Sequence, residues 1–130
     1  MTKTDRDRNP VVLVVEDETL VRVTALAIIE ESGFEAIAAG NGDEAIRAME
    51  TRSDIRAVFT DVQMPGQMDG IKLAEVIRDR WPSVALLVTS GKGQILESEL
   101  PNGGRFLAKP YLPFQIETVL RELLEKPRSP

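Results

Sequence analysis

The chain has neither cysteine nor histidine among its 130 residues. Without cysteine it can form no disulfide and no thiolate site. Without histidine it lacks the most common zinc ligand and general base, and it cannot carry a phosphohistidine of its own. Any metal site in this chain must therefore use oxygen ligands, which favours a hard cation such as Mg²⁺.

Basic charge and long apolar runs are also scarce. The net charge is −5 and the pI is about 4.8, which disfavours nonspecific binding to nucleic acid. No apolar run approaches the roughly 20 residues that cross a bilayer, and residues 1–9 lack the apolar core of a signal peptide. We therefore expect a soluble, cytoplasmic protein that binds neither nucleic acid nor membranes.

The apolar residues that are present suffice for one domain. Hydrophobic residues make up 42% of the chain and charged residues 28%, as in ordinary globular proteins. Residues 1–9 are polar and show no apolar periodicity, so we expect a flexible leader there. The periodic sequence predicts one domain over residues 10–125, followed by a tail over 126–130.

Segments typical of buried strands alternate with helical patterns. Val11–Val15 is a continuous β-branched run, typical of a parallel strand buried on both faces. Further strands are expected at 34–39, 57–61, 84–88 and 105–108, and helices over 19–32, 43–51, 70–80, 94–100 and around 116–124. This alternation predicts an α/β fold: a doubly wound, five-stranded parallel sheet in the order 2-1-3-4-5 with five helices, as in flavodoxin-like proteins.

Polar side chains follow four of the predicted strands at the same end. They are Glu16 and Asp17 after the first strand, Asp61 at the end of the third, Thr89 after the fourth and Lys109 after the fifth. Each alone also has a structural interpretation, as a turn residue, a helix-start acid or a solvated lysine. Because strands one and three adjoin where the strand order reverses, we expect Glu16, Asp17 and Asp61 to converge.

Such a group of side chains predicts phosphoryl-transfer chemistry. Clustered carboxylates repel one another, and a divalent cation relieves that repulsion. Asp61 can attack phosphorus to form an aspartyl phosphate. Mg²⁺ and Lys109 would neutralise phosphoryl oxygens, and Thr89 would donate a hydrogen bond to one of them.

Together these residues resemble the receiver domain of bacterial two-component response regulators. The resemblance covers about residues 10–125. It rests on the pair Glu16–Asp17, the segment Asp61–Gly66 with Asp69–Gly70, the stretch Thr89–Gly91, and Lys109–Pro110. Many members of the family have alanine where this chain has Ser90.

The resemblance implies a role for each matching residue. Asp61 would accept a phosphoryl group from the phosphohistidine of a sensor histidine kinase or a histidine phosphotransferase. Mg²⁺ would be held by Glu16, Asp17, Asp61 and the backbone carbonyl of Gln63. Lys109 would bind the phosphoryl group, and Thr89 and Phe106 would form the switch that presents a surface to an unidentified downstream protein. The chain would be a stand-alone signalling switch that catalyses only its own phosphorylation and dephosphorylation.

Other interpretations remain open from the residues alone. A haloacid-dehalogenase-like phosphatase also uses a strand-end aspartate and Mg²⁺, but its second acid would stand at Gln63. A nucleotide or flavin site needs a phosphate-binding loop after the first strand, where this chain is acidic. The remaining alternatives are a receiver used only for docking, and a receiver that belongs to a longer protein with an output or kinase domain.

Overall fold

The structure, a computed structural model, describes residues 9–64, 66–93, 95 and 97–125. Its elements in chain order are β1 (Val11–Val15), α1 (Thr19–Glu31), β2 (Glu35–Ala39), α2 (Gly42–Thr51), β3 (Ile55–Asp61), α3 (Gly70–Arg80), β4 (Ala85–Ser90), the 3₁₀ helices η2 (Glu97–Glu99) and η3 (Pro101–Gly103), β5 (Arg105–Ala108) and α4 (Pro113–Glu125). Apart from residue 9, the predicted leader and tail lie outside the described residues.

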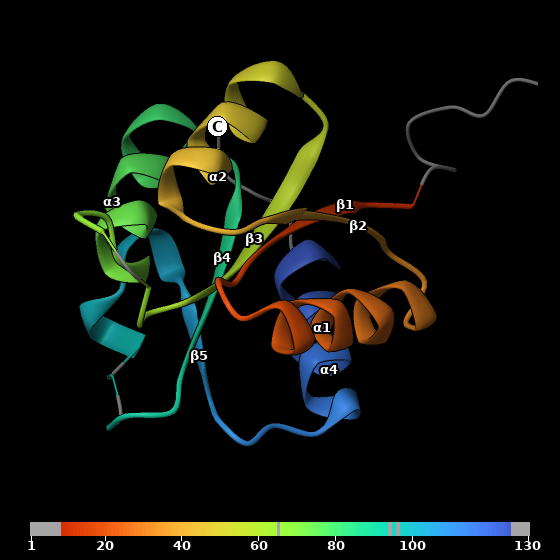
Figure 1. The fold of residues 1–130 in the computed structure, drawn as a ribbon. Helices are drawn as coiled ribbons and strands as arrows, with labels where there is room; N and C mark the ends of the chain where they lie inside the picture. The colour runs from red at the N-terminus through yellow and green to blue at the C-terminus, as the bar shows by residue number, and fades with distance from the viewer. Residues whose placement is uncertain (1–8, 65, 94, 96, 126–130) are drawn as a thin grey trace, which may run out of the picture.

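The five strands form one parallel sheet in the order β2-β1-β3-β4-β5 (Figure 1). The predicted fold class and strand order are therefore confirmed. β2 lies at one edge, and four of its five residues are exposed or partly exposed, whereas every residue of β1 is buried. This difference agrees with the sequence, because a continuous apolar run such as β1 needs cover on both faces of the sheet.

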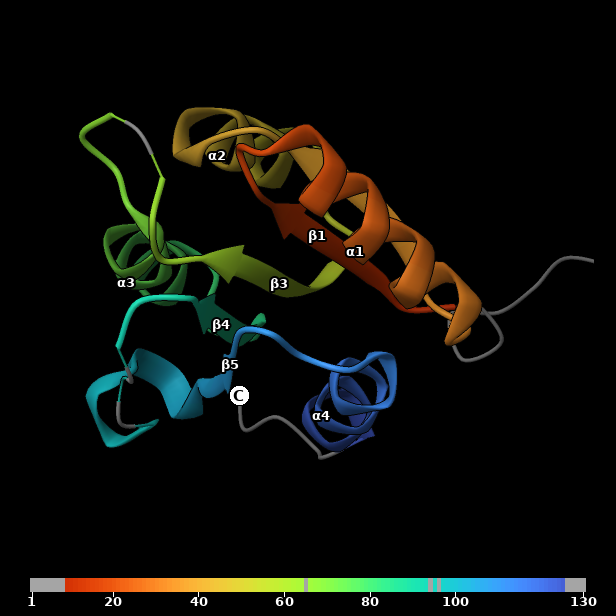
Figure 2. The same ribbon diagram turned by 60° about the horizontal axis from the view of Figure 1, so that its bottom comes forward.

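Helices cover both faces of the sheet (Figures 1 and 2). Leu13 and Val15 of β1 face α2 and α3, where Ala45, Leu73 and Ile77 complete one half of the core. The intervening side chains of β1 point to the opposite face and pack against α1 and α4. This alternation along a single strand produces two apolar clusters, one on each side of the sheet.

The prediction of five α-helices is wrong for the described residues, which contain four. The expected helix over 94–100 falls partly outside the description, because residues 94 and 96 are not described. The chain instead forms η2 and then η3, which begins at Pro101. Pro101 has no N–H to continue a helical ladder, and Gly103 adopts a positive φ of 69°. Short 3₁₀ turns therefore replace a regular helix.

Helix α3 begins in direct contact with the end of β3. The side chain of Asp69 caps it by accepting a hydrogen bond from the Lys72 N–H at 2.9 Å. Gly70 donates its N–H to the Val62 carbonyl at 3.0 Å. A Cβ at Gly70 would collide with the carbonyl oxygen of Asp61, so the helix approaches this closely only because residue 70 is glycine. None of the described helices is long and apolar enough to cross a bilayer.

Candidate functional site

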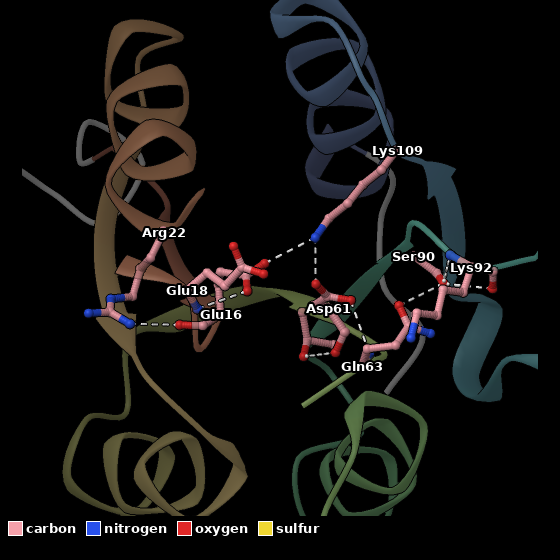
Figure 3. Close-up of polar contacts among 9 residues, drawn as sticks. Glu16, Glu18, Arg22, Asp61, Gln63, Ser90, Lys92 and Lys109 are labelled. Carbon is pink, nitrogen blue, oxygen red and sulfur yellow. Dashed lines mark hydrogen bonds and ion pairs between the residues drawn. The ribbon is translucent and has the colours of Figure 1, made fainter. Parts of the chain in front are cut away.

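Asp61 lies at the carboxyl-terminal edge of the sheet, with Glu16, Gln63 and Lys109 beside it (Figure 3). It is only 5% exposed and opens into a pocket of about 740 Å³. Thr89 pairs with it in register on β4. Lys109 follows β5 and Glu16 follows β1, and both side chains reach toward Asp61. The predicted convergence of these strand ends is therefore present.

The ammonium of Lys109 joins two carboxylates. Its Nζ lies 2.5 Å from Asp61 Oδ2 and 3.2 Å from Glu16 Oε1. Burial by itself would lower the pKa of Lys109, but the hydrogen bond to Asp61 and the attraction of both carboxylates raise it above its ordinary value. Lys109 therefore stays charged and balances the two buried acids.

The peptide bond between Lys109 and Pro110 is cis.

Glu16 is buried beside Asp61 and held by the turn that follows β1. Its Oε2 accepts a hydrogen bond from the Glu18 N–H at 3.1 Å, and its backbone carbonyl accepts one from Arg22 at 2.8 Å. Burial raises the pKa of the Glu16 carboxyl, and the neighbouring Asp61 carboxylate adds to that shift against the opposing effects of the Glu18 N–H and Lys109. Both the Glu18 N–H and Lys109 thus favour the charged form of Glu16.

Asp17 is exposed and lines the pocket together with Asp61 and Gln63. These residues offer carboxylate and carbonyl oxygens to an open, water-accessible space, which fits Mg²⁺ because that ion binds one or two carboxylates and keeps several waters. Among the described residues no three acidic side chains lie close enough to hold a metal by themselves. Glu16 contacts Lys109 instead, so its role as a ligand remains a prediction.

The two predicted switch residues occupy different positions. Thr89 is 3% exposed, and its hydroxyl has no hydrogen-bond partner within the part of the chain that the structure describes. It borders a void of about 10 Å³ beside Asp61 and Tyr111. Phe106 lies opposite Val88 on β5 and is partly exposed, and its N–H donates to Glu97 at 2.8 Å. Switching by Thr89 and Phe106 stays a prediction.

Sequence reasoning did not identify two further contributors to this site. The ring of Tyr111 packs edge-on against Phe59 with 5.7 Å between centroids, and burial raises the pKa of its hydroxyl. Its position two residues after Lys109 was an available signal. Ser90 donates a hydrogen bond to the Gln63 side chain, 27 residues away. No local pattern indicates that contact.

The chain was compared with known proteins. The profile of the response regulator receiver domain matches residues 12–121. The chain is 33% identical over 127 residues to the sensor kinase CckA of Brucella abortus, covering 95% of this chain and 13% of that protein. It is 30% identical over 123 residues to the aerobic respiration control protein ArcA of Escherichia coli K12, covering 92% of this chain and 50% of that protein. The chain thus spans half or less of these curated relatives.

Solved structures show the same fold. NtrX from Brucella abortus superposes with a TM-score of 0.81 at 30% identity, covering 90% of this chain and 27% of that one. A response regulator receiver protein from Sinorhizobium medicae superposes with a TM-score of 0.82 at 24% identity, covering 92% and 97%, and this likeness concerns the fold alone. Because the family profile matches most of its length, the chain belongs to the response regulator receiver domains of two-component systems.

Proposed function

We propose that this receiver is a phosphorylation switch in which Asp61 accepts a phosphoryl group from a phosphohistidine. The donor would be a sensor histidine kinase or a histidine phosphotransferase. A carboxylate oxygen of Asp61 attacks phosphorus, and the bond from phosphorus to the imidazole nitrogen breaks. The observation that carries this proposal is the ion pair of Asp61 with Lys109 at the rim of an open pocket.

Lys109 and Thr89 are suited to receive the new group. A phosphoryl group brings about −1.5 to −2 charges to the site. The Lys109 ammonium already lies beside Asp61 and can neutralise part of that charge. The buried Thr89 hydroxyl can donate to a phosphoryl oxygen, which would give it the partner that it lacks among the described residues. Movement of Thr89 and Phe106 would then switch the surface presented to a downstream protein.

Mg²⁺ completes the proposal. Asp17, Asp61 and the carbonyl of Gln63 would hold it, with Glu16 binding directly or through a water molecule. When bound, the ion neutralises phosphoryl oxygens as charge moves onto them. The acidic lining around Asp61 supports this proposal, because four acidic residues line the pocket and only two lysines, Lys92 and Lys109, line it with them.

Exposed apolar side chains near the pocket support a protein partner. Leu20 is 82% exposed and Val23 54% in the first half of α1. Leu112, just before α4, is 56% exposed, and Phe114 in its first turn is 63% exposed. These segments directly follow the strand ends that carry Glu16 and Lys109. Exposed apolar side chains of this size favour a docking surface. We propose that the phosphodonor protein covers them while its histidine reaches Asp61.

Phosphorylation by a small donor tests the chemistry directly. The protein is incubated with acetyl phosphate and Mg²⁺, and its intact mass is recorded. We expect the wild type to gain one phosphoryl group, Asp61→Asn to gain none, and excess EDTA to prevent the gain in the wild type. A wild-type mass that does not change, or an Asp61→Asn variant that is modified equally, would refute the assignment of Asp61.

We also propose that the chain acts as a stand-alone receiver and not as an enzyme on an external substrate. The matched relatives are domains of longer proteins, so this point needs its own test. The native protein should migrate at the size of this chain on an immunoblot of the source cells. A larger native product would place this receiver within a multidomain protein.

A further inference from the structure

Arg22 of α1 holds the turn that carries the two acids after β1. Its guanidinium Nη1 donates a hydrogen bond to the backbone carbonyl of Glu16 at 2.8 Å (Figure 3). That carbonyl belongs to the peptide group that joins Glu16 to Asp17. Because a peptide group is planar, a partner that fixes its carbonyl also fixes the direction in which the chain enters the next residue. Arg22 therefore acts on the orientation of Asp17 through the main chain.

The side chain of Asp17 depends on this main chain for its position. It is exposed and lines the pocket of Asp61, and among the described residues it makes no hydrogen bond or ion pair. The carboxylate of Glu16, in contrast, is held directly by the Glu18 N–H and by Lys109. The direction in which Asp17 points into the pocket is thus set by the backbone of the turn.

The end of β2 supports the same turn from the other side. The Glu16 N–H donates to the Ala39 carbonyl at 3.1 Å. The guanidinium of Arg22 lies beside the next residue, because a Cβ at Gly40 would be only 3.6 Å from Arg22 Nη1. The peptide groups before and after Glu16 are therefore held by two different elements, β2 and α1. Of these two contacts, the one made by Arg22 can be removed by changing a side chain.

We propose that Arg22 is a positioning residue that fixes the peptide between Glu16 and Asp17 and thereby sets Asp17 for binding Mg²⁺. This inference rests on the proposed Mg²⁺ site. Groups that orient a metal ligand typically contribute about 10- to 100-fold to affinity. The positive charge of Arg22 acts in the opposite direction, because a nearby cation repels Mg²⁺. Removal of Arg22 thus has opposite effects on affinity according to whether its position or its charge dominates.

The test is a metal titration of the unphosphorylated protein, followed by nuclear magnetic resonance. Arg22→Met should bind Mg²⁺ about tenfold more weakly than the wild type. Its affinity for Ca²⁺ should fall less, because Ca²⁺ accepts a wider range of ligand geometries. Arg22→Lys keeps the charge and a shorter donor, so its Mg²⁺ affinity should lie between those of the wild type and Arg22→Met. Without metal, the amide signal of Asp17 should shift in Arg22→Met.

Arg121→Met is the matched control. Arg121 also donates to a backbone carbonyl, that of Ser32 at 2.7 Å, but it does so at the opposite end of α1 from Glu16. Its replacement removes the same charge and the same kind of contact. We expect Arg121→Met to bind Mg²⁺ with the affinity of the wild type and to leave the amide signal of Asp17 in place.

Each other outcome overturns the inference. Tighter Mg²⁺ binding by Arg22→Met would show that the charge of the arginine dominates, and unchanged binding would exclude the positioning role. An equal loss in Arg121→Met would trace the effect to stability. If Arg22→Met does not fold, an Arg22→Lys protein with wild-type affinity overturns the inference. A wild type that binds no Mg²⁺ would refute the proposed metal as well, whereas one that binds Mg²⁺ but takes up no phosphoryl group would refute only the phosphorylation of Asp61.

Discussion

Replacing Gly70 with alanine tests how closely α3 must approach the end of β3. An added Cβ would overlap the Asp61 carbonyl oxygen and lie 2.9 Å from the Cα of Val62. Those neighbours are backbone atoms, so the helix or the strand end must move. Overpacking of this kind costs about 1–3 kcal/mol, whereas alanine would gain roughly 0.5–1 kcal/mol over glycine inside a helix. We therefore expect Gly70→Ala to lower the free energy of unfolding by about 2 kcal/mol, the cost of severe overpacking less the gain in helix propensity.

Gly42 provides a matched control. Each glycine is the first residue of a helix and follows a capping side chain, Asn41 or Asp69. A Cβ at Gly42 would meet the side chain of Met68 at 2.8 Å. Rotation of the Met68 side chain would relieve the contacts with its Cγ and Sδ but not the one with its Cβ at 2.9 Å, so we expect Gly42→Ala to cost about 1 kcal/mol, less than Gly70→Ala.

Urea denaturation and thermal melts, both monitored by circular dichroism, measure the stability of the two variants. For Gly70→Ala a loss of about 2 kcal/mol would lower the melting temperature by about 8 °C in a domain of this size. The phosphorylation of Asp61 should slow in parallel, because the overlap falls on the backbone carbonyl of Asp61 itself. Equal effects of the two substitutions, or a stabilised Gly70→Ala protein, would refute the contact argument and leave only helix propensity.

Three further predictions concern charge. Lys109→Met removes the cation between two buried acids and should cost about 2 kcal/mol at pH 7. The loss should shrink as the pH falls below 7, because burial raises the pKa of Glu16 above its ordinary value and a bound proton removes the unpaired charge; an equal shift of the urea midpoint at every pH would contradict this. Glu97 has a pKa below its usual 4.5, through the Phe106 N–H and then Arg105. Its stabilisation exists above pH 4.5 and is lost as the pH falls through the folded pKa, so the melting temperatures of wild type and Glu97→Gln should converge as the pH is lowered below 4.5; melting curves that stay equally far apart would exclude it. Asp17→Asn should weaken Mg²⁺ binding about tenfold by calorimetry, and unchanged affinity would remove Asp17 from the ligands.

Local sequence predicted those parts of the fold that depend on local pattern. The bounds of β1 and β5 agree with the prediction, because each strand ends where apolar residues give way to a charged one, Glu16 or Lys109. β4 extends to Ser90, two residues beyond the predicted end, because its ladder continues beside Asp61 of β3. The predicted helix over 94–100 rested on a short segment, and Pro101 and Gly103 directly after it favour tight turns instead.

The sequence by itself determined the chemistry available at the site. Alternation of strands and helices places Glu16, Asp61, Thr89 and Lys109 at one edge of the sheet, since parallel strands all end on the same side. That inference needs only the order of elements and the residue at each strand end.

Only the tertiary structure decided which partner each of those side chains contacts. Glu16 turns inward to Lys109 while its neighbour Asp17 faces the pocket, and Ser90 engages Gln63 from another strand. Gly70 is required not by its own helix but by the carbonyl of Asp61 against it. Such contacts join residues far apart in the chain, and their distances depend on how the layers pack and not on any local pattern of residues.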